Sequence, residues 1–125
     1  MILDTNALSA WAKADEALLA VLPAEHLLVL PVVVIGEYRY GVRRSQQRKS
    51  LESWLDRTVR AVMVGTITLA TADSYAAVRM MVHRKGRPIP TNDAWIAALA
   101  LQHRLPVLSR DPHFDVVDGV TRISW

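Results

Sequence analysis

The sequence predicts an α/β fold built on a parallel sheet, because short apolar runs alternate with longer amphipathic segments along the chain. Continuous apolar runs are typical of strands that are buried on both faces. Residues 1–3 form one such run, which stops abruptly at Asp4. Residues 107–109 are expected to form another strand, which ends just before Asp111. Ligands of parallel sheets bind beyond the carboxyl ends of the strands, where strand order reverses, so Asp4 and Asp111 are expected at the same edge.

Prolines and one capping side chain bound the first elements. Asn6 is the expected N-cap of a helix over residues 7–13. A second helix over residues 15–22 closes at Pro23, which cannot continue a helix. The apolar run 27–30, bounded by a further proline, predicts a buried strand.

The middle of the chain predicts two helices and a strand. Residues 32–44 are expected to be helical, although the β-branched start at 32–35 would also suit a strand. Residues 45–62 predict a second helix, because their apolar side chains recur at helical spacing. These side chains are Leu51, Trp54, Leu55 and Val59. Residues 66–69, which follow Gly65, predict a strand.

The last part of the chain predicts two helices separated by a basic loop. Thr71 or Asp73 is the expected cap of the first helix, which reaches a loop rich in glycine, proline and basic residues at 85–90. Asn92 is the expected cap of the second, over residues 93–103. Final strands are expected over residues 107–109 and 120–124.

Composition limits the class of protein. The chain has 125 residues, of which 51% are hydrophobic, with no cysteine and a net charge of +3. This length predicts a single domain over residues 1–125, and the hydrophobic share excludes intrinsic disorder. The lack of cysteine excludes a disulfide scaffold, thiolate metal sites and a thiol nucleophile, and it fits a cytoplasmic protein. With neither a signal-peptide pattern nor an apolar run of bilayer length, no membrane partner is expected.

Carboxylates at four positions suggest a shared site: Asp4, Glu37, Asp93 and Asp111. Each alone has a simpler explanation as a cap, a solvated helix residue, a first-turn acid or a turn residue. In one pocket, however, their repulsion must be relieved, because two like charges about 4 Å apart cost about 4 kcal/mol at an effective dielectric near 20. Clustered carboxylate oxygens suit Mg²⁺ or Mn²⁺. On a basic protein, such a site indicates a phosphodiester substrate.

Four segments carry these carboxylates in order. They are Ile-Leu-Asp-Thr-Asn at residues 2–6, Glu37 followed by Tyr-Gly at 40–41, Pro-Thr-Asn-Asp-Ala-Trp at 90–95, and Leu-Ser-Arg-Asp-Pro-His-Phe at 108–114. Together they resemble the ordered acidic motifs of PIN-domain ribonucleases, in particular the VapC-type toxins of toxin–antitoxin systems. The resemblance covers essentially the whole chain. It implies a three-layer α/β domain with a five-stranded parallel sheet in the order 3-2-1-4-5.

The resemblance also implies a site and a reaction. Asp4, Glu37, Asp93 and Asp111 match the acidic quartet of the family. Asp4, Asp93 and Asp111 would bind Mg²⁺ (or Mn²⁺), and Glu37 would orient the attacking water or accept its proton. The implied reaction is hydrolysis of an RNA phosphodiester bond by a metal-activated water. The implied partners are RNA, a second copy of the chain in a homodimer, and a cognate antitoxin that obstructs the acidic pocket.

Other residues near the quartet also have expected roles. The resemblance gives Asn6 and Ser109 supporting roles, and Asp115 could share the part of Asp111. Arg110 could pair with a neighbouring acid. The imidazole of His113, beside a phenylalanine, is interpreted as a packing group.

Basic and aromatic residues suggest surfaces for partners. Arg84, Lys85 and Arg87 are expected to contact substrate phosphates, because they closely precede Asp93. A second basic run, comprising Arg43, Arg44, Arg48 and Lys49, is expected to be a solvated face. Trp95 is expected in the core. An apolar surface for another subunit could form from Trp11, Trp54, Tyr38 and Tyr40.

Two other functions remain open at the level of sequence. One is a noncatalytic PIN-like module that only binds RNA or a protein. The other is a Mg²⁺-dependent phosphatase of the haloacid-dehalogenase type, in which an aspartate after the first strand is the nucleophile. That family has a second aspartate two positions later, where this chain has Asn6.

Overall fold

A five-stranded parallel sheet lies at the centre of the computed structural model, which describes residues 1–22 and 27–125. The strand order is β3-β2-β1-β4-β5, which confirms the expected topology. The strands are β1 (Ile2–Leu3), β2 (Val29–Pro31), β3 (Met63–Gly65), β4 (Val107–Leu108) and β5 (Arg122–Ile123). Because β1 lies between β2 and β4, strand order reverses at β1, and the edge beyond β1 and β4 is the expected ligand site.

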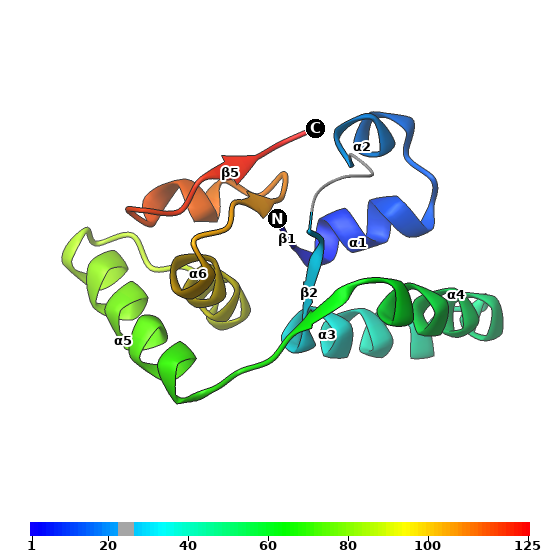
Figure 1. Cartoon of the computed structure of the whole chain (residues 1–125), viewed down its shortest axis with the longest axis horizontal. Helices are drawn as coiled ribbons and strands as arrows, with labels where there is room; N and C mark the ends of the chain where they lie inside the picture. Colours follow the sequence, from blue (N-terminus) through cyan, green and yellow to red (C-terminus); the bar gives the residue numbers. More distant parts are fainter. Residues whose placement is uncertain (23–26) are drawn as a thin grey trace.

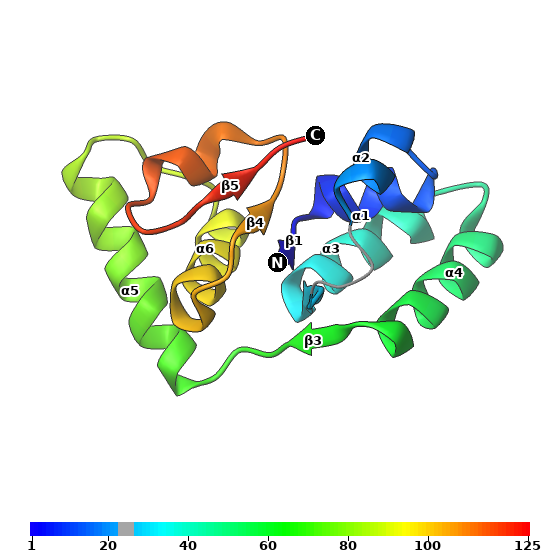
Figure 2. The same ribbon diagram turned by 45° about the horizontal axis from the view of Figure 1, so that its top comes forward.

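The helices form two groups around this sheet. They are α1 (Thr5–Ala12), α2 (Glu16–Val21), α3 (Val32–Arg43), α4 (Arg48–Ala61), α5 (Leu69–Arg84) and α6 (Thr91–His103), with a short 3-10 helix η1 (Pro112–Val116). Figures 1 and 2 place α1 to α4 on one side and α5 with α6 on the other. Among the described residues, every helix is too short or too polar to cross a membrane.

The start of α1 differs from the expectation. Asp4, not Asn6, is the N-cap, and its side chain accepts a hydrogen bond from the Thr5 backbone N–H at 2.6 Å. Asp4 still has an extended backbone, so the helix begins directly after β1 and places Asn6 inside its first turn. The helix α2 is capped by Asp15, while the predicted stop at Pro23 lies outside the described residues.

The start of α6 was also predicted wrongly. Pro90 takes the N-cap position without a side-chain hydrogen bond, and Asn92 lies within the helix. A proline is suited to the start of a helix, because its fixed φ fits this position and its missing N–H would have no helical partner. The carboxylate of Asp93 therefore lies in the first turn of α6.

The third strand lies earlier in the chain than expected. Residues 66–69 do not form it; β3 ends at Gly65 because its residues pair with β2, Val29 opposite Met63 and Pro31 opposite Gly65. A Cβ atom on Gly65 would lie 3.0 Å from Val29 Cγ1, so this register favours glycine. The next helix, α5, is capped by Thr68 in a reciprocal arrangement with Thr71, and not by Thr71 or Asp73.

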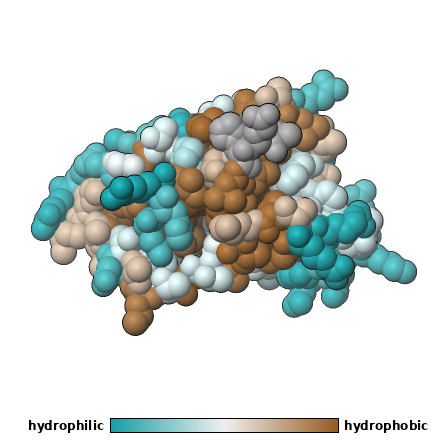
Figure 3. Space-filling model, viewed as in Figure 1, coloured by the Kyte–Doolittle hydropathy of each residue, from teal (hydrophilic) through white to brown (hydrophobic). Residues whose placement is uncertain are grey.

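The core centres on α6, which is apolar on nearly all sides. Its buried residues are Ala94, Ile96, Ala97, Ala98, Leu99 and Ala100. It contacts α5, α3, β1 and β4, as a helix in the interior of a domain must. Charged and polar residues instead gather toward the two ends of the face drawn in Figure 3, with apolar residues across its middle.

The tryptophans are arranged differently from the expectation. Trp95 is only partly buried and stacks on Tyr75, with ring centroids 3.9 Å apart. Trp11 and Trp54 pack edge-to-face against each other and against the core, with ring centroids 5.9 Å apart. These two rings therefore join α1 to α4 and do not form an open surface.

Candidate metal centre

One pocket lies at the carboxyl ends of β1 and β4. All four predicted carboxylates line it, from four different elements: Asp4, Glu37, Asp93 and Asp111. Lys13, Asp15 and Arg110 lie in the same wall. The structure thus brings the acidic quartet together at the edge where strand order reverses.

Asp4 is the most deeply placed of these carboxylates. It is 5% exposed and accepts three hydrogen bonds, from Thr5 N at 2.6 Å, Asn6 Nδ2 at 2.9 Å and Ser109 Oγ at 2.7 Å. Burial raises the pKa of the Asp4 carboxyl, and the negative charges of Asp93 and Asp111 act in the same direction. The hydrogen bonds from Ser109 and Thr5 only partly offset this increase.

Ser109 and Asn6 link the ends of β1 and β4. The buried Ser109 hydroxyl donates to Asp4, and it accepts from Asn6 Nδ2 at 3.0 Å and from the Asp111 backbone N–H at 2.9 Å. The carbonyl oxygen of the Asn6 side chain accepts from the Arg110 backbone N–H at 3.3 Å. Ser109 thus bonds to both Asp4 and the Asp111 backbone, whereas Asn6 bonds to Asp4, Ser109 and the Arg110 backbone.

Glu37 reaches the pocket from α3. Its carboxylate accepts a hydrogen bond from the Thr5 hydroxyl, which lies at the start of α1. The contact between α1 and α3 therefore positions Glu37 at the pocket, where its charge also acts on Asp93.

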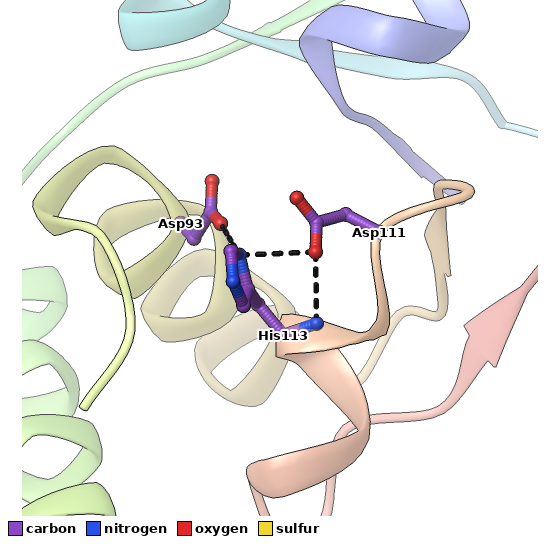
Figure 4. A group of neighbouring side chains, drawn as sticks. All are labelled: Asp93, Asp111 and His113. Atoms are coloured by element: carbon purple, nitrogen blue, oxygen red, sulfur yellow. Dashed lines mark hydrogen bonds and ion pairs between the residues drawn. The ribbon is translucent and has the colours of Figure 1, made fainter. Parts of the chain in front are cut away.

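Asp93 and Asp111 meet at the imidazole of His113. The His113 Nδ1 atom lies 2.7 Å from Asp93 Oδ2 and 3.0 Å from Asp111 Oδ1 (Figure 4). Burial raises the pKa of the Asp93 carboxyl, with a further contribution from Asp111, while His113 acts in the opposite direction. The packing interpretation of His113 was wrong: its side chain is 41% exposed and faces two carboxylates.

Sequence position alone could have suggested that His113 lies beside Asp111, but not that it meets Asp93. Asp111 caps the short helix η1 by accepting the His113 backbone N–H at 3.0 Å. An aspartate side chain in such a turn accepts the backbone N–H of the residue two positions later, which places that residue beside it. The signal was therefore the Asp-x-His spacing at residues 111–113.

Asp115 belongs to another cluster. Its two carboxylate oxygens accept from Arg122 Nε and a terminal Arg122 nitrogen, both at 2.8 Å. This pairing lowers the pKa of the Asp115 carboxyl. Asp115 does not line the acidic pocket, so the geometry does not support a role shared with Asp111.

The cations nearest the quartet are not those that the sequence indicated. Lys13 and Arg110 line the pocket. Arg110 forms an ion pair with Asp15 at 3.4 Å, in agreement with the expectation that Arg110 pairs with a neighbouring acid. Arg110 also lies over the Trp125 ring, 4.5 Å from its centroid. Arg84 and Lys85 line a different cavity, where Lys85 donates to Asp118 at 2.6 Å.

The donor set fits a hard divalent cation. Carboxylate oxygens of Asp4, Asp93 and Asp111 face one pocket, and the raised pKa values of Asp4 and Asp93 show that burial and negative charge there are incompletely compensated. A divalent cation would relieve this imbalance, and oxygen ligands of this kind suit Mg²⁺ and Mn²⁺.

A parallel α/β sheet with a carboxylate cluster at the edge where strand order reverses defines a class of metal-dependent site. Comparison with known proteins places the chain within this class. The family model described as the PIN domain matches residues 1–120. The chain therefore belongs to the PIN-domain family.

Individual relatives agree with this assignment. Ribonuclease VapC5 of Mycobacterium tuberculosis is 30% identical over 130 residues, which cover 98% of this chain and 91% of the relative. The crystal structure of FitAcB from Neisseria gonorrhoeae matches with a TM-score of 0.86 at 27% identity, covering 98% of this chain and 95% of that chain. VapBC2 from Rickettsia felis, bound to promoter DNA, shares the fold with a TM-score of 0.89 at 21% identity, covering 99% and 97% of the two chains.

Proposed function

We propose that this protein is a VapC-type endoribonuclease toxin, which hydrolyses RNA phosphodiester bonds with a water activated by a divalent ion. The observation that supports the proposal best is the convergence of Asp4, Glu37, Asp93 and Asp111 in one pocket of a PIN-domain protein. The name of a full-length relative, Ribonuclease VapC5, supports the same reaction. We further propose that residues 1–125 act as a single domain.

Each pocket residue has a role in this proposal. Asp4, Asp93 and Asp111 would hold Mg²⁺ or Mn²⁺, which would supply a water of lowered pKa and neutralise charge on the attacked phosphate. Glu37, held by the Thr5 hydroxyl, orients the attacking water or accepts its proton. Asn6 and Ser109 orient Asp4 through the hydrogen bonds described above.

Basic residues guide the RNA. Lys13 and Arg110 are the cations placed to meet a phosphate next to the acidic cluster. Arg84, Lys85 and Arg87 remain proposed phosphate contacts farther along the substrate, although Lys85 is already paired with Asp118. Such contacts increase affinity without reading sequence.

A cognate antitoxin inhibits the enzyme in this proposal. The crystal structure of VapBC-5 from Mycobacterium tuberculosis, whose matching chain is 28% identical to this one, is described as a member of the VapBC family of toxin-antitoxin systems. A groove continuous with the acidic pocket shares Thr5, Lys13 and Glu37 with it. The side chains of Tyr38 and Leu51 make part of this groove apolar. This groove suits an antitoxin segment that extends into the pocket. We also propose that the protein forms a homodimer and acts in the cytoplasm.

Cleavage of total cellular RNA tests the reaction. The substitutions Asp4→Asn and Asp93→Asn should lower cleavage in Mg²⁺ or Mn²⁺ by about a hundredfold or more, because each removes an anionic metal ligand. A chelator should abolish cleavage by the wild type. Asp73→Asn, on the exposed face of α5, is the matched control and should leave the rate unchanged.

Two outcomes would contradict the proposal. Full activity of both Asp4→Asn and Asp93→Asn would show that the quartet does not catalyse the reaction. RNA binding without scission during long incubation with Mg²⁺ and Mn²⁺ would instead identify a noncatalytic module.

A further inference from the structure

We propose that His113 is a direct ligand of the divalent ion through Nδ1, and that this nitrogen makes the site select Mn²⁺ over Mg²⁺. The inference rests on the proposed function only in that a divalent ion occupies the acidic pocket. It assigns to a histidine a place in a site otherwise built from carboxylates, and it names the ion that this chain prefers.

The donor atoms already have the spacing of ligands around one ion. His113 Nδ1 lies 2.7 Å from Asp93 Oδ2 and 3.0 Å from Asp111 Oδ1, and one donor atom from each of the three residues lies within 4.8 Å of the others. Neighbouring ligands of an octahedral ion with bonds of about 2.1 Å are about 3.0 Å apart. The imidazole nitrogen thus faces the two carboxylates at the separation of ligands that share an octahedral edge (Figure 4).

The chain holds this nitrogen in place by local structure. Asp111 accepts the His113 backbone N–H at 3.0 Å, and Pro112 restricts the backbone of the turn between them. The next residue, Phe114, is 0% exposed and anchors the turn in the core. Asp93 comes from the first turn of the buried helix α6. The three donors therefore project from rigid elements, which is a condition for a preorganised metal site.

Ligand chemistry then determines the preference. Mg²⁺ binds almost entirely to oxygen and demands near-ideal octahedral geometry. Mn²⁺ shares the preference of Mg²⁺ for carboxylate oxygen, and it binds nitrogen more weakly than the later transition metals do. As a transition-metal ion it nevertheless binds an imidazole nitrogen more tightly than Mg²⁺ does, so one nitrogen ligand separates these two ions. The nitrogen of His113 therefore increases the affinity of the site for Mn²⁺ more than its affinity for Mg²⁺. The other ligands are the carboxylates of Asp4, Asp93 and Asp111.

A different role for His113 makes another prediction. If its ring only donates a hydrogen bond to the two carboxylates, it orients them without touching the ion. Loss of His113 would then weaken Mn²⁺ and Mg²⁺ binding by similar factors, and no nitrogen would be bound to the ion. The two roles can therefore be separated by binding and by spectroscopy, without any measurement of RNA cleavage.

Pulsed electron paramagnetic resonance on the Mn²⁺-loaded protein tests direct coordination. The wild type should show the coupling of a directly bound ¹⁴N nucleus, which becomes a ¹⁵N coupling when histidine is labelled with ¹⁵N. His113→Gln should lose this signal. His103→Gln, at the exposed end of α6, is the matched control and should retain it.

Calorimetric titration with each ion, in the absence of RNA, tests the selectivity. His113→Gln should weaken Mn²⁺ binding by about tenfold or more and change Mg²⁺ binding by less than about threefold. His113→Asp replaces the nitrogen by oxygen and should shift the preference toward Mg²⁺. The circular dichroism spectrum of each metal-free variant should match that of the wild type, which shows that the fold is retained. The melting temperature of metal-free His113→Asp should be lower, because it adds a third carboxylate beside Asp93 and Asp111.

The outcomes distinguish this proposal from the proposed function. If Asp93→Asn abolishes ion binding but the wild type shows no nitrogen coupling and His113→Gln has an unchanged Mn²⁺ to Mg²⁺ ratio, His113 is not a ligand, while the metal-dependent nuclease stands. If the wild type binds neither ion, both proposals fail. Nitrogen coupling that disappears in His113→Gln supports the ligand even if no RNA is cleaved.

Discussion

Ser109 joins two parts of the chain that are far apart in sequence. Its hydroxyl is bonded to Asp4 and Asn6, which precede it by 105 and 103 residues, and to the backbone of Asp111. A buried hydroxyl with three partners fixes the Asp4 carboxylate relative to the Asp111 backbone at the ends of β1 and β4. The geometry of the acidic pocket therefore depends on a residue that carries no charge.

Ser109→Ala should destabilise the protein by about 1–3 kcal/mol, because it leaves the Asp111 N–H without its acceptor and Asp4 without one donor. Denaturant unfolding measures this change, and RNA cleavage should fall with it. Ser124→Ala, at an exposed serine, should leave stability within about 0.5 kcal/mol of the wild type. Equal stabilities of the two variants would contradict a linking role for Ser109.

Asp93 makes the stability of the metal-free protein depend on pH. Burial raises its pKa above the ordinary value of 3.8, so the folded state binds this proton more tightly than the unfolded state does. The stability that the Asp93 carboxyl contributes is therefore fully present below pH 3.8. It is lost as the pH rises through the pKa of this carboxyl in the folded state. At neutral pH the full cost of the charge is present.

Asp93→Asn should therefore raise the melting temperature at pH 7 in a chelator, and the gain should shrink as pH falls toward 4. Asp115→Asn is a control of opposite sign, because the bonds from Arg122 lower the pKa of Asp115. That variant should lose stability at pH 7, and its loss should fade in acid. Thermal unfolding between about pH 2 and pH 7 measures both trends, because the Asp115 contribution is lost only as the pH falls below 3.8. A pH-independent difference for Asp93→Asn would contradict the assigned cause.

At the scale of the element, α6 connects the core to the site. Its first turn carries Asp93, while the residues that follow are buried between the sheet and α5. Asp93 can therefore be held in position by apolar packing several residues away.

Leu99→Ala should cost about 2–5 kcal/mol, because Leu99 is fully buried and its removal leaves a cavity. Leu69→Ala is the matched control at a leucine that is 89% exposed, and it should change stability by less than about 0.5 kcal/mol. Denaturant midpoints compare the two variants. Similar midpoints would show that α6 is not the centre of the core.

The whole molecule separates its charges. Its net charge is +3, yet the pocket holds a cluster of carboxylates with Lys13 and Arg110 on the same wall. An acidic site within a basic protein attracts a polyanion only through the cations near it. We therefore expect phosphate contacts from Lys13 and Arg110 on the pocket wall.

Lys13→Gln should weaken RNA binding and reduce the slope of log affinity against log salt by about 0.7, the value for one phosphate contact to a single strand. Lys49→Gln, in the basic run expected to be solvated, should change neither quantity. Fluorescence anisotropy in the Asp4→Asn background, where no cleavage is expected, measures both. An unchanged salt slope for Lys13→Gln would exclude a phosphate contact at this residue.

The existence, type and order of most elements were predictable, because they depend on local patterns. Buried strands appear as short apolar runs, and helices appear as periodic segments bounded by proline or by polar caps. The meeting of Asp4 and Asp111 followed as well, since parallel strands end at a common edge. Element boundaries were less predictable. The β-branched residues after Gly65 have the composition of a strand, yet the register with β2 places β3 before them.

The sequence by itself determined which chemistry the chain can perform, since the carboxylates, their order and the short strands before two of them are local features. Tertiary structure alone decided which neutral and basic residues join them: Ser109 between two strand ends, Lys13 on the pocket wall, and His113 between Asp93 and Asp111. The physical reason is that these partners meet through packing of elements distant in sequence, and no local periodicity records such contacts.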